Sequence, residues 1–200
     1  MSLAATPLAS TAQGQPVEGR HYLAVSPRQP TRDPRQVEVL EFFAYSCGHC
    51  HAFEPALDAW QKALPPDVLF RRIPVAFRDE LVPHNYLYFA LETLGLVESM
   101  HRKVFDAFHG GGEKFDSAAA LARFADRHRL DTPKLMAAMT SFAVASKAKQ
   151  AFALAQGYKI EGTPALGVDG QWLTSGAMAG TNLKSLAVAE YLIGLAKRTR

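Results

Sequence analysis

The stretch Val37–Cys50, which reads VEVLEFFAYSCGHC, decides the fold of this chain. Its first part, Val37–Phe43, is rich in strand-forming residues. It is apolar on both faces except at Glu38 and Glu41, which is typical of a strand buried in the centre of a sheet. Its last four residues form the motif Cys47-Gly48-His49-Cys50, and apolar residues at helical spacing follow it. The sequence therefore predicts a buried strand, a turn, and a helix that begins at a Cys-x-x-Cys motif.

Cys47 and Cys50 are the only two cysteines among the 200 residues. Two thiols spaced i, i+3 in the first turn of a helix can close a disulfide across that turn. No third cysteine is left to form a structural bridge. A Cys-x-x-Cys motif between a strand and a helix is typical of redox-active dithiols. We therefore interpret the motif as a site of thiol–disulfide exchange.

Three other interpretations of the two cysteines stay open at this point. A structural zinc site needs four ligands, and the motif offers only Cys47, Cys50 and His51. The string Cys47-x-x-Cys50-His51 also matches the attachment pattern of c-type haem, which would make the protein an electron-carrying cytochrome. His51 would then be one axial ligand of the iron, and the other would be Met100, Met136, Met139 or Met178. The third interpretation is an incidental pair of buried cysteines.

The composition is that of an ordinary globular protein. Hydrophobic residues make up 48% of the chain and charged residues 20%. This length fits one large domain or two small ones and allows a sizeable core. The net charge is +3 and the basic residues are scattered, so we expect no nucleic-acid partner. The chain contains no apolar run of about 18 residues, so we expect no transmembrane helix.

The N-terminal segment, Met1–Pro16, is made of small and polar residues with proline and glycine. It has neither the basic region nor the continuous apolar region of a signal peptide. We therefore expect a flexible tail here and not an intact signal peptide.

The order of strand and helix signals predicts a sheet that is interrupted by a long helical segment. We expect strands at His21–Val25, Val37–Phe43 and Val68–Val75, and a helix that contains Pro55 and runs from the cysteine motif to about Leu64. Further along, we expect a hairpin of Ala165–Val168 and Gln171–Thr174 joined by Asp169-Gly170. A final helix is expected to be capped by Asn182.

Residues 80–157, between the third strand and the hairpin, carry helix signals throughout. Asp116 or Ser117 is expected to cap one of these helices, and Thr132-Pro133 to begin another. We expect this last helix to run as one long element to Gly157. Its apolar residues are interpreted as core: Met136, Met139, Phe142 and Phe152.

With these elements in place, the sequence resembles the thioredoxin fold, and more closely the DsbA group of thiol oxidases. The residues that carry the resemblance are Glu41-Phe42-Phe43, Cys47-Gly48-His49-Cys50, Phe53-Glu54, and Gly162-Thr163-Pro164 before the hairpin. The resemblance implies an α/β protein with a thioredoxin fold and an inserted helical subdomain. It divides the chain into a flexible tail at 1–19, a thioredoxin-like domain at 20–79 and 158–200, and the insertion at 80–157.

The resemblance also implies a function. The protein would be a monomeric periplasmic thiol:disulfide oxidoreductase that donates its Cys47–Cys50 disulfide to reduced, unfolded exported proteins. It would need no bound cofactor and no metal, because the disulfide is the redox group, and a membrane-bound, quinone-linked partner of the DsbB kind would reoxidise it. The best-known members of the group carry Pro-His between the cysteines, whereas this chain has Gly48-His49. A disulfide isomerase or reductase therefore stays an alternative.

Within the motif, Cys47 is the expected nucleophile. It stands at the start of a helix, where backbone N–H groups and the helix dipole favour a thiolate. His49 is expected to add a positive charge or a hydrogen bond to the same sulfur. A stable thiolate stabilises the reduced protein and so makes the disulfide a better oxidant. Cys50 lies one turn deeper and is expected to be buried, where it would resolve unproductive mixed disulfides.

The loop Gly162-Thr163-Pro164 is the expected substrate-binding element. The resemblance implies that the Thr163–Pro164 peptide bond is cis and that the loop packs against the cysteine motif. Its backbone could then pair with an extended substrate peptide as an added strand.

Glu41 is a carboxylate in an otherwise apolar strand. Burial would raise its pKa and allow it to shuttle the proton of Cys50. Arg72 on the neighbouring strand could instead keep Glu41 charged in a purely structural ion pair, and this alternative stays open. The remaining histidines of the central part of the chain are interpreted as surface or core residues: His51, His84, His101, His109 and His128.

Overall fold

The computed structural model describes residues 14–199, so most of the expected N-terminal tail lies outside the described residues. The described strands form one sheet in the order β1-β5-β4-β2-β3. They are β1 Leu23–Ala24, β2 Val37–Phe43, β3 Val68–Pro74, β4 Ala165–Val168 and β5 Trp172–Ser175. β2 runs parallel to β3, and all other neighbours are antiparallel. The strand before the cysteine motif therefore lies inside the sheet, and all seven of its residues are buried.

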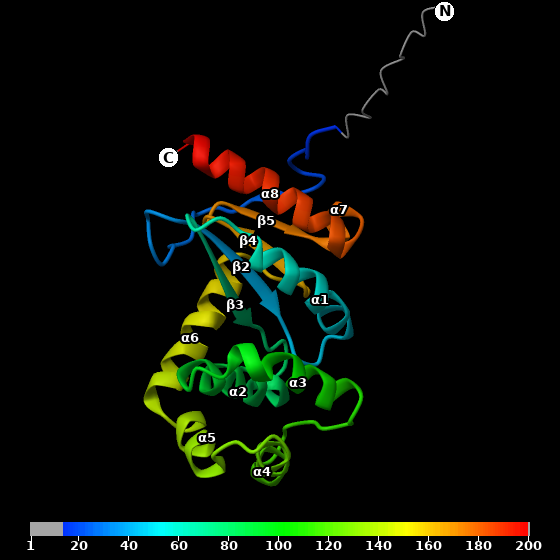
Figure 1. The fold of residues 1–200 in the computed structure, drawn as a ribbon. Helices are drawn as coiled ribbons and strands as arrows, with labels where there is room; N and C mark the ends of the chain where they lie inside the picture. Colours follow the sequence, from blue (N-terminus) through cyan, green and yellow to red (C-terminus); the bar gives the residue numbers. More distant parts are fainter. Residues whose placement is uncertain (1–13, 200) are drawn as a thin grey trace, which may run out of the picture.

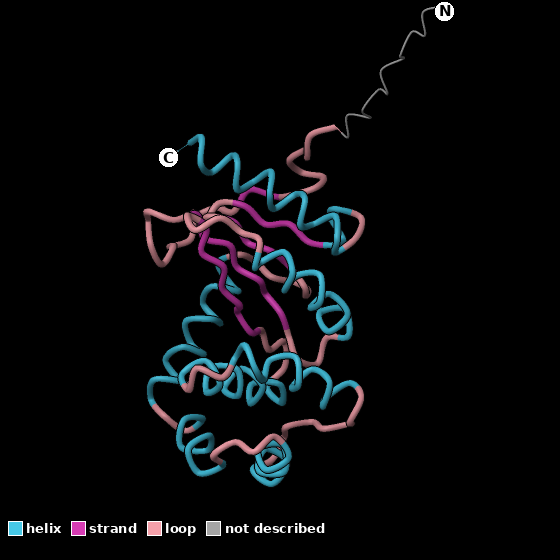
Figure 2. The backbone as a smooth tube through the Cα atoms, in the orientation of Figure 1, coloured by secondary structure: helices cyan, strands magenta, loops and turns pink. Residues whose placement is uncertain are grey.

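Helices cover both faces of the sheet (Figures 1 and 2). On one face, α1 (Gly48–Lys62) and α8 (Asn182–Thr199) pack with Val37 and Val39 of β2 in one hydrophobic cluster. Side chains alternate along a strand, so Leu40 points to the opposite face, into a second cluster with the helices between β3 and β4. These helical elements are η1 Asp79–Leu81, α2 Val82–Thr93, α3 Val97–His109, α4 Ala118–Arg127, α5 Thr132–Met139 and α6 Phe142–Gly157.

The helices between β3 and β4 also lie beyond the end of the sheet. Figure 1 shows α2, α3, α4 and α5 gathered past the carboxyl ends of β2 and β3, while α6 returns along the sheet. The residues that follow β2 therefore meet both the sheet and the inserted helices. The mixed α/β architecture with a helical segment between the third strand and the hairpin is confirmed. The division into domains at residues 79 and 157 stays a prediction.

The hairpin has the turn that its sequence predicts. Asp169 and Gly170 both adopt positive φ, 53° and 70°, as a two-residue type I′ turn requires. The second strand begins at Trp172, one residue later than expected, because the Gln171 N–H still closes the turn on the carbonyl of Val168 at 3.0 Å. The short helix α7 (Gly176–Ala179) then leads to α8.

Several element ends differ from the sequence prediction. The first strand is only Leu23–Ala24, although the Val25 N–H still donates to the Gln171 carbonyl at 2.7 Å. The helix that contains Pro55 ends at Lys62 and not at Leu64. The cap of α8 is Thr181, whose Oγ1 accepts from the Lys184 N–H at 3.1 Å, so Asn182 is already the first helical residue.

The predicted long helix from Thr132 to Gly157 is wrong. Asp131 caps α5 by accepting from the Lys134 N–H at 3.0 Å, one residue before the expected cap. A second cap, Ser141, accepts from the Val144 N–H at 3.2 Å and starts α6 as a separate helix. Because α6 starts anew at Ser141, it turns other side chains toward the core. The assignment of Phe142 and Phe152 to the core is therefore wrong: they are 89% and 57% exposed. By contrast, Ser117 caps α4 as predicted.

None of the helices in residues 14–199 combines the length and the apolar character that crossing a membrane requires.

Candidate active site

The Cys-x-x-Cys motif lies where β2 leaves the sheet and α1 begins. Cys47 is the N-cap of α1, with φ −89° and ψ 110°, and its Sγ accepts a hydrogen bond from the Cys50 N–H at 3.3 Å. The sulfur therefore takes the place that a serine or aspartate oxygen has in an ordinary helix cap. In that place it faces the positive end of the helix dipole, which favours a thiolate.

The two sulfurs, both present as free thiols, have very different surroundings. Cys47 is partly exposed, whereas Cys50 is 0% exposed. A hydrogen bond from the Cys50 side chain outweighs partial burial, and with backbone N–H groups of Cys50 and His49 it lowers the pKa of Cys47 from 9.0 to about 5. Burial raises the pKa of Cys50 far above its ordinary value. Near neutral pH, a thiolate at Cys47 and a thiol at Cys50 are therefore the favoured states.

We expect the Cys47 thiolate to persist far below the pH range of an ordinary cysteine. In the reduced protein, alkylation of Cys47 by iodoacetamide should reach half of its maximal rate at about pH 5. Because this pKa is lowered on folding, the thiolate stabilises the folded reduced protein fully above pH 9.0, and this stabilisation is lost as the pH falls toward 5. The urea-unfolded chain is the control, since its cysteines should show an ordinary thiol profile. A half-maximal rate near pH 8 in the folded protein would contradict this assignment.

The proline loop contacts the same sulfur. The Thr163–Pro164 peptide bond is cis, as the sequence resemblance implied. The carbonyl oxygen of Thr163 lies 3.3 Å from Cys47 Sγ and accepts the S–H hydrogen bond when Cys47 is a thiol. Two segments more than 100 residues apart in the chain therefore meet at the reactive sulfur.

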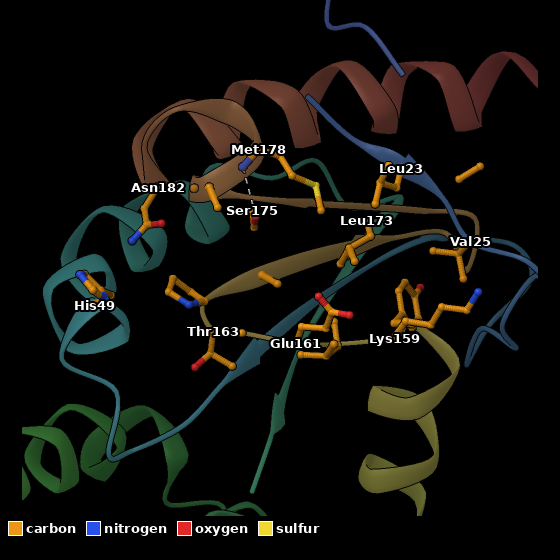
Figure 3. Close-up of a pocket in the computed structure, with 18 of the residues that line it drawn as sticks. Leu23, Val25, His49, Lys159, Glu161, Thr163, Leu173, Ser175, Met178 and Asn182 are labelled. Atoms are coloured by element: carbon orange, nitrogen blue, oxygen red, sulfur yellow. Dashed lines mark hydrogen bonds between the residues drawn. The ribbon is translucent and has the colours of Figure 1, made fainter. Parts of the chain in front are cut away.

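A cavity of about 800 Å³ opens beside this contact. Gly162, Thr163 and Pro164 line it together with residues of β1, β5 and α7 (Figure 3). Its walls are mostly apolar, with Leu23, Leu173 and Met178 among them, and the charged residues Lys159 and Glu161 belong to the same lining. The cavity is continuous with the proline loop and has the size of a few amino-acid side chains.

His49 lies at the edge of this cavity, on the first turn of α1 (Figure 3). Its side chain is exposed, and its backbone N–H is among the groups that favour the Cys47 thiolate. The expected contribution of the imidazole itself to the sulfur stays a prediction.

Glu41 is fully buried beneath the motif and faces Arg72. The two residues are register partners in the parallel pair of β2 and β3, so their side chains leave the same face of the sheet. Arg72 Nε lies 3.1 Å from Glu41 Oε2, but the contact is an ion pair and not an aligned hydrogen bond. Burial and the charge of Glu54 outweigh Arg72 and raise the pKa of Glu41 to about 8. A carboxylate with this pKa exists in both protonation states near neutral pH, which suits proton transfer.

Three further side chains, which were not predicted from the sequence, extend this pair into a network. Glu54 of α1 accepts from Arg72 Nη2 at 3.1 Å, and its second oxygen lies 3.2 Å from His101 Nε2 on α3. The hydroxyl of Tyr45 lies 2.8 Å from His101 Nδ1. All of these side chains are buried or nearly so. A signal was present, because His101 falls on the apolar face of α3 with Met100, Val104 and Phe105, and a buried histidine needs polar partners.

Glu41, Glu54 and His101 offer ligand atoms that lie within 4.8 Å of one another, which is the spacing of a metal site. Arg72 already supplies the positive charge at this place, because its guanidinium contacts both carboxylates. We therefore interpret the group as a buried charge network.

The other histidines near the motif hold α1 and the loop before it. His51 Nε2 lies 2.7 Å from Asp106 Oδ1, and its ring stacks on that of His109 with centroids 4.9 Å apart. His109 donates from Nε2 to the carbonyl of Tyr45 at 2.9 Å. The inserted helix α3 therefore holds α1 through Asp106 and the turn between β2 and Cys47 through His109.

The comparisons with known proteins agree with this geometry. Residues 76–187 match the model of the DSBA-like thioredoxin domain family. The chain is 37% identical over 175 residues to the thiol:disulfide interchange protein DsbA of Azotobacter vinelandii, covering 88% of this chain and 82% of that protein. It is 36% identical over 196 residues to the DsbA of Bordetella parapertussis, covering 96% and 91%.

This chain belongs to the DsbA family. The crystal structure of Pseudomonas aeruginosa DsbA superposes with a TM-score of 0.88 at 32% identity and covers 92% of this chain and 95% of that one. The DsbA-like fold and the thiol:disulfide oxidoreductase activity that the sequence resemblance implied are therefore confirmed.

The cytochrome interpretation is wrong for a DsbA-family protein. Haem attachment uses both cysteines of the motif, but Cys50, on the first turn of α1, is 0% exposed. His51, the expected axial ligand, is engaged with Asp106 and stacked on His109. The pattern Cys-x-x-Cys-His thus arises here from a dithiol motif followed by a histidine with a structural contact.

Proposed function

We propose that this DsbA-family protein oxidises reduced, unfolded exported proteins in the periplasm by donating its Cys47–Cys50 disulfide. The observation that carries the proposal is the asymmetry of the two cysteines. Cys47 is accessible and its pKa is lowered to about 5, whereas Cys50 is fully buried. A disulfide whose reduced form is stabilised by a thiolate is a strong oxidant.

The reaction follows from this asymmetry. A substrate thiolate attacks Cys47 Sγ, the Cys47–Cys50 bond breaks, and Cys50 takes up a proton as it leaves. Glu41, with a pKa of about 8, is the group that supplies this proton. A second substrate thiolate then attacks the substrate sulfur of the mixed disulfide, and Cys47 leaves as a thiolate. The substrate loses two electrons and gains a disulfide, and the protein is left with the reduced dithiol.

Substrate binding is assigned to Gly162, Thr163 and Pro164 and to the cavity beside them. An extended peptide can pair with the backbone of this loop as an added strand. Its apolar side chains would enter the cavity of about 800 Å³. This would hold the substrate's cysteine next to Cys47 Sγ, which its thiolate attacks. An unfolded substrate offers both features, an exposed backbone and exposed apolar side chains.

After each turnover the reduced protein must lose two electrons. We assign this step to a membrane-bound, quinone-linked partner of the DsbB kind, which would meet the same face because Cys47 is the accessible sulfur. No bound cofactor is assigned to the protein itself, and it is proposed to act as a monomer.

The equilibrium of the Cys47–Cys50 disulfide with glutathione tests the proposal. We expect a reduction potential above about −200 mV, more oxidising than the glutathione couple of a reducing compartment. Thiol trapping after equilibration in glutathione buffers gives the ratio of the two forms. A potential close to that of thioredoxin, about −270 mV, would instead favour the reductase alternative, in which Gly48-His49 weakens the oxidant.

A further inference from the structure

Two buried carboxylates share one arginine beneath the cysteines, but a histidine contacts only one of them. Arg72 lies 3.1 Å from Glu41 through Nε and 3.1 Å from Glu54 through Nη2. Of the two carboxylates, His101 contacts only Glu54, at 3.2 Å. We propose that His101 is a positioning residue that keeps Glu54 ionised and thereby places the exchangeable proton of this cluster on Glu41. The inference deepens the proposed function, because it explains how Glu41 comes to hold the proton for Cys50.

The hydrogen-bond directions follow from the charges. Burial favours the neutral form of His101 and lowers its pKa. A neutral imidazole carries one N–H, and the side facing the Glu54 carboxylate must be the donor, so the hydrogen is on Nε2. Nδ1 is then an acceptor, and the Tyr45 hydroxyl, 2.8 Å away, donates to it. Tyr45 and Glu54 thus hold His101 in one tautomer.

The two carboxylates differ in the donors that they receive. Glu54 accepts an aligned hydrogen bond from Arg72 on one oxygen and one from His101 on the other. Glu41 meets Arg72 only through an ion pair without hydrogen-bond alignment. An anion with two donors is stabilised more than one with a single poorly aligned contact. When the cluster takes up a proton, Glu41 is therefore the carboxylate that binds it.

The direction of the pKa shifts supports this placement. His101 and Arg72 outweigh burial and lower the pKa of Glu54, while burial and the charge of Glu54 raise that of Glu41 to about 8. The titratable groups that face the cluster from the packed elements, besides those already named, are Cys47, Cys50, Asp58 and Tyr88. Cys47 and Glu54 raise the pKa of Glu41, and Asp58 and Glu54 oppose the neutral form of His101.

Without the His101 donor, the difference between the two carboxylates would shrink. Glu54 would keep only its hydrogen bond from Arg72, and Glu41 and Glu54 would compete more evenly for the same proton. The proton would then spend part of its time on Glu54, in α1, instead of on Glu41 in β2. Because α3 supplies His101, the inserted helical segment controls the protonation of a residue in the sheet.

A matched pair of variants isolates the donor. His101→Gln keeps an amide N–H near the position of Nε2, whereas His101→Asn is one methylene shorter and its amide does not reach Glu54. The measurement is the pH titration of the side-chain carboxyl ¹³C signals of Glu41 and Glu54 in the reduced protein. Glu41→Gln and Glu54→Gln assign the two signals. His84→Asn, which alters another buried histidine that contacts the Lys114 carbonyl, is the structural control.

We expect the Glu54 titration midpoint to rise by about one pH unit in His101→Asn, since a hydrogen bond to a carboxylate is worth roughly this much. The Glu41 midpoint should fall as Glu54 takes a share of the proton. His101→Gln and His84→Asn should leave both midpoints near their wild-type values. Midpoints that do not move in His101→Asn, or that move equally in His84→Asn, overturn the proposal.

The wild-type protein provides a second measurement that does not depend on a variant folding. The ¹⁵N shifts of His101 should report a neutral imidazole with its hydrogen on Nε2 across the pH range in which Glu41 titrates. A protonated His101, or a hydrogen on Nδ1, in that range overturns the proposal. These titrations do not involve turnover, so a thioredoxin-like potential would disprove the proposed function and leave this inference standing.

Discussion

Cys47→Ser should abolish disulfide transfer completely, whereas Cys50→Ser should convert the protein into a trap for its partners. Only Cys47 is open to an incoming thiolate, because Cys50 is 0% exposed. A serine at position 47 cannot form the mixed disulfide through which exchange proceeds. The measurement is the oxidation of a reduced cysteine-containing peptide in a glutathione buffer, where Cys47→Ser should run at the rate of the buffer alone.

Cys50→Ser is the matched control, since it removes the other sulfur from the same helix turn. Its Cys47 should form a mixed disulfide with glutathione that persists, because the internal thiol that would release it is gone. Mass spectrometry of the intact protein should detect this adduct. Residual catalysis by Cys47→Ser, or the failure of Cys50→Ser to hold an adduct, would show that the roles of the two cysteines have been assigned the wrong way round.

Arg72→Met should cause the largest loss of stability of any single substitution in the charge network. The change leaves Glu41 and Glu54 buried without their shared cation, and breaking a buried ion pair from one side costs about 3–5 kcal/mol. Urea unfolding of the reduced protein at neutral pH measures this loss. Arg127→Met is the control, because it removes an exposed guanidinium from the Glu113 contact at 2.8 Å, where a surface ion pair contributes under about 1 kcal/mol.

The loss should also depend on pH in a definite direction. In Arg72→Met, Glu41 loses the charge that opposes its protonation and should hold, in the folded state, a proton that the unfolded chain releases above about pH 4.5. The folded state then binds more protons than the unfolded state, so the stability of the variant falls as the pH rises from 5 to 8. Arg72→Met/Glu54→Gln should recover part of the loss. An Arg72→Met variant as stable as Arg127→Met would mean that the buried network contributes little.

Local patterns were sufficient for most of the elements. The apolar run of β2, the Asp169-Gly170 turn and the Ser117 cap are each decided by a few adjacent residues, and the structure confirms all three. The prediction of one long helix over residues 132–157 failed because it, too, relied on a local pattern. The apolar spacing continues across Ser141. A serine at this position can either continue the helix or cap a new one, and only packing decides between these two roles.

The cysteine motif indicated the chemistry of this protein without any structure. Two thiols one helical turn apart, after a buried strand, favour thiol–disulfide exchange over the other interpretations. The family comparison confirms this activity. The resemblance to the DsbA group added the proline loop, which the chain brings to within 3.3 Å of Cys47.

Only the tertiary structure decided which charged groups meet beneath that motif. Glu41, Glu54, Arg72 and His101 come from β2, α1, β3 and α3, and no spacing along the chain relates them. The proton affinity of each depends on how deeply it is buried and on which partner reaches it, and both are set by the packing of distant segments. The sequence offered Glu41 and Arg72 as a pair with two possible roles. The fold added Glu54 and His101, and it is these two that make the carboxylates unequal.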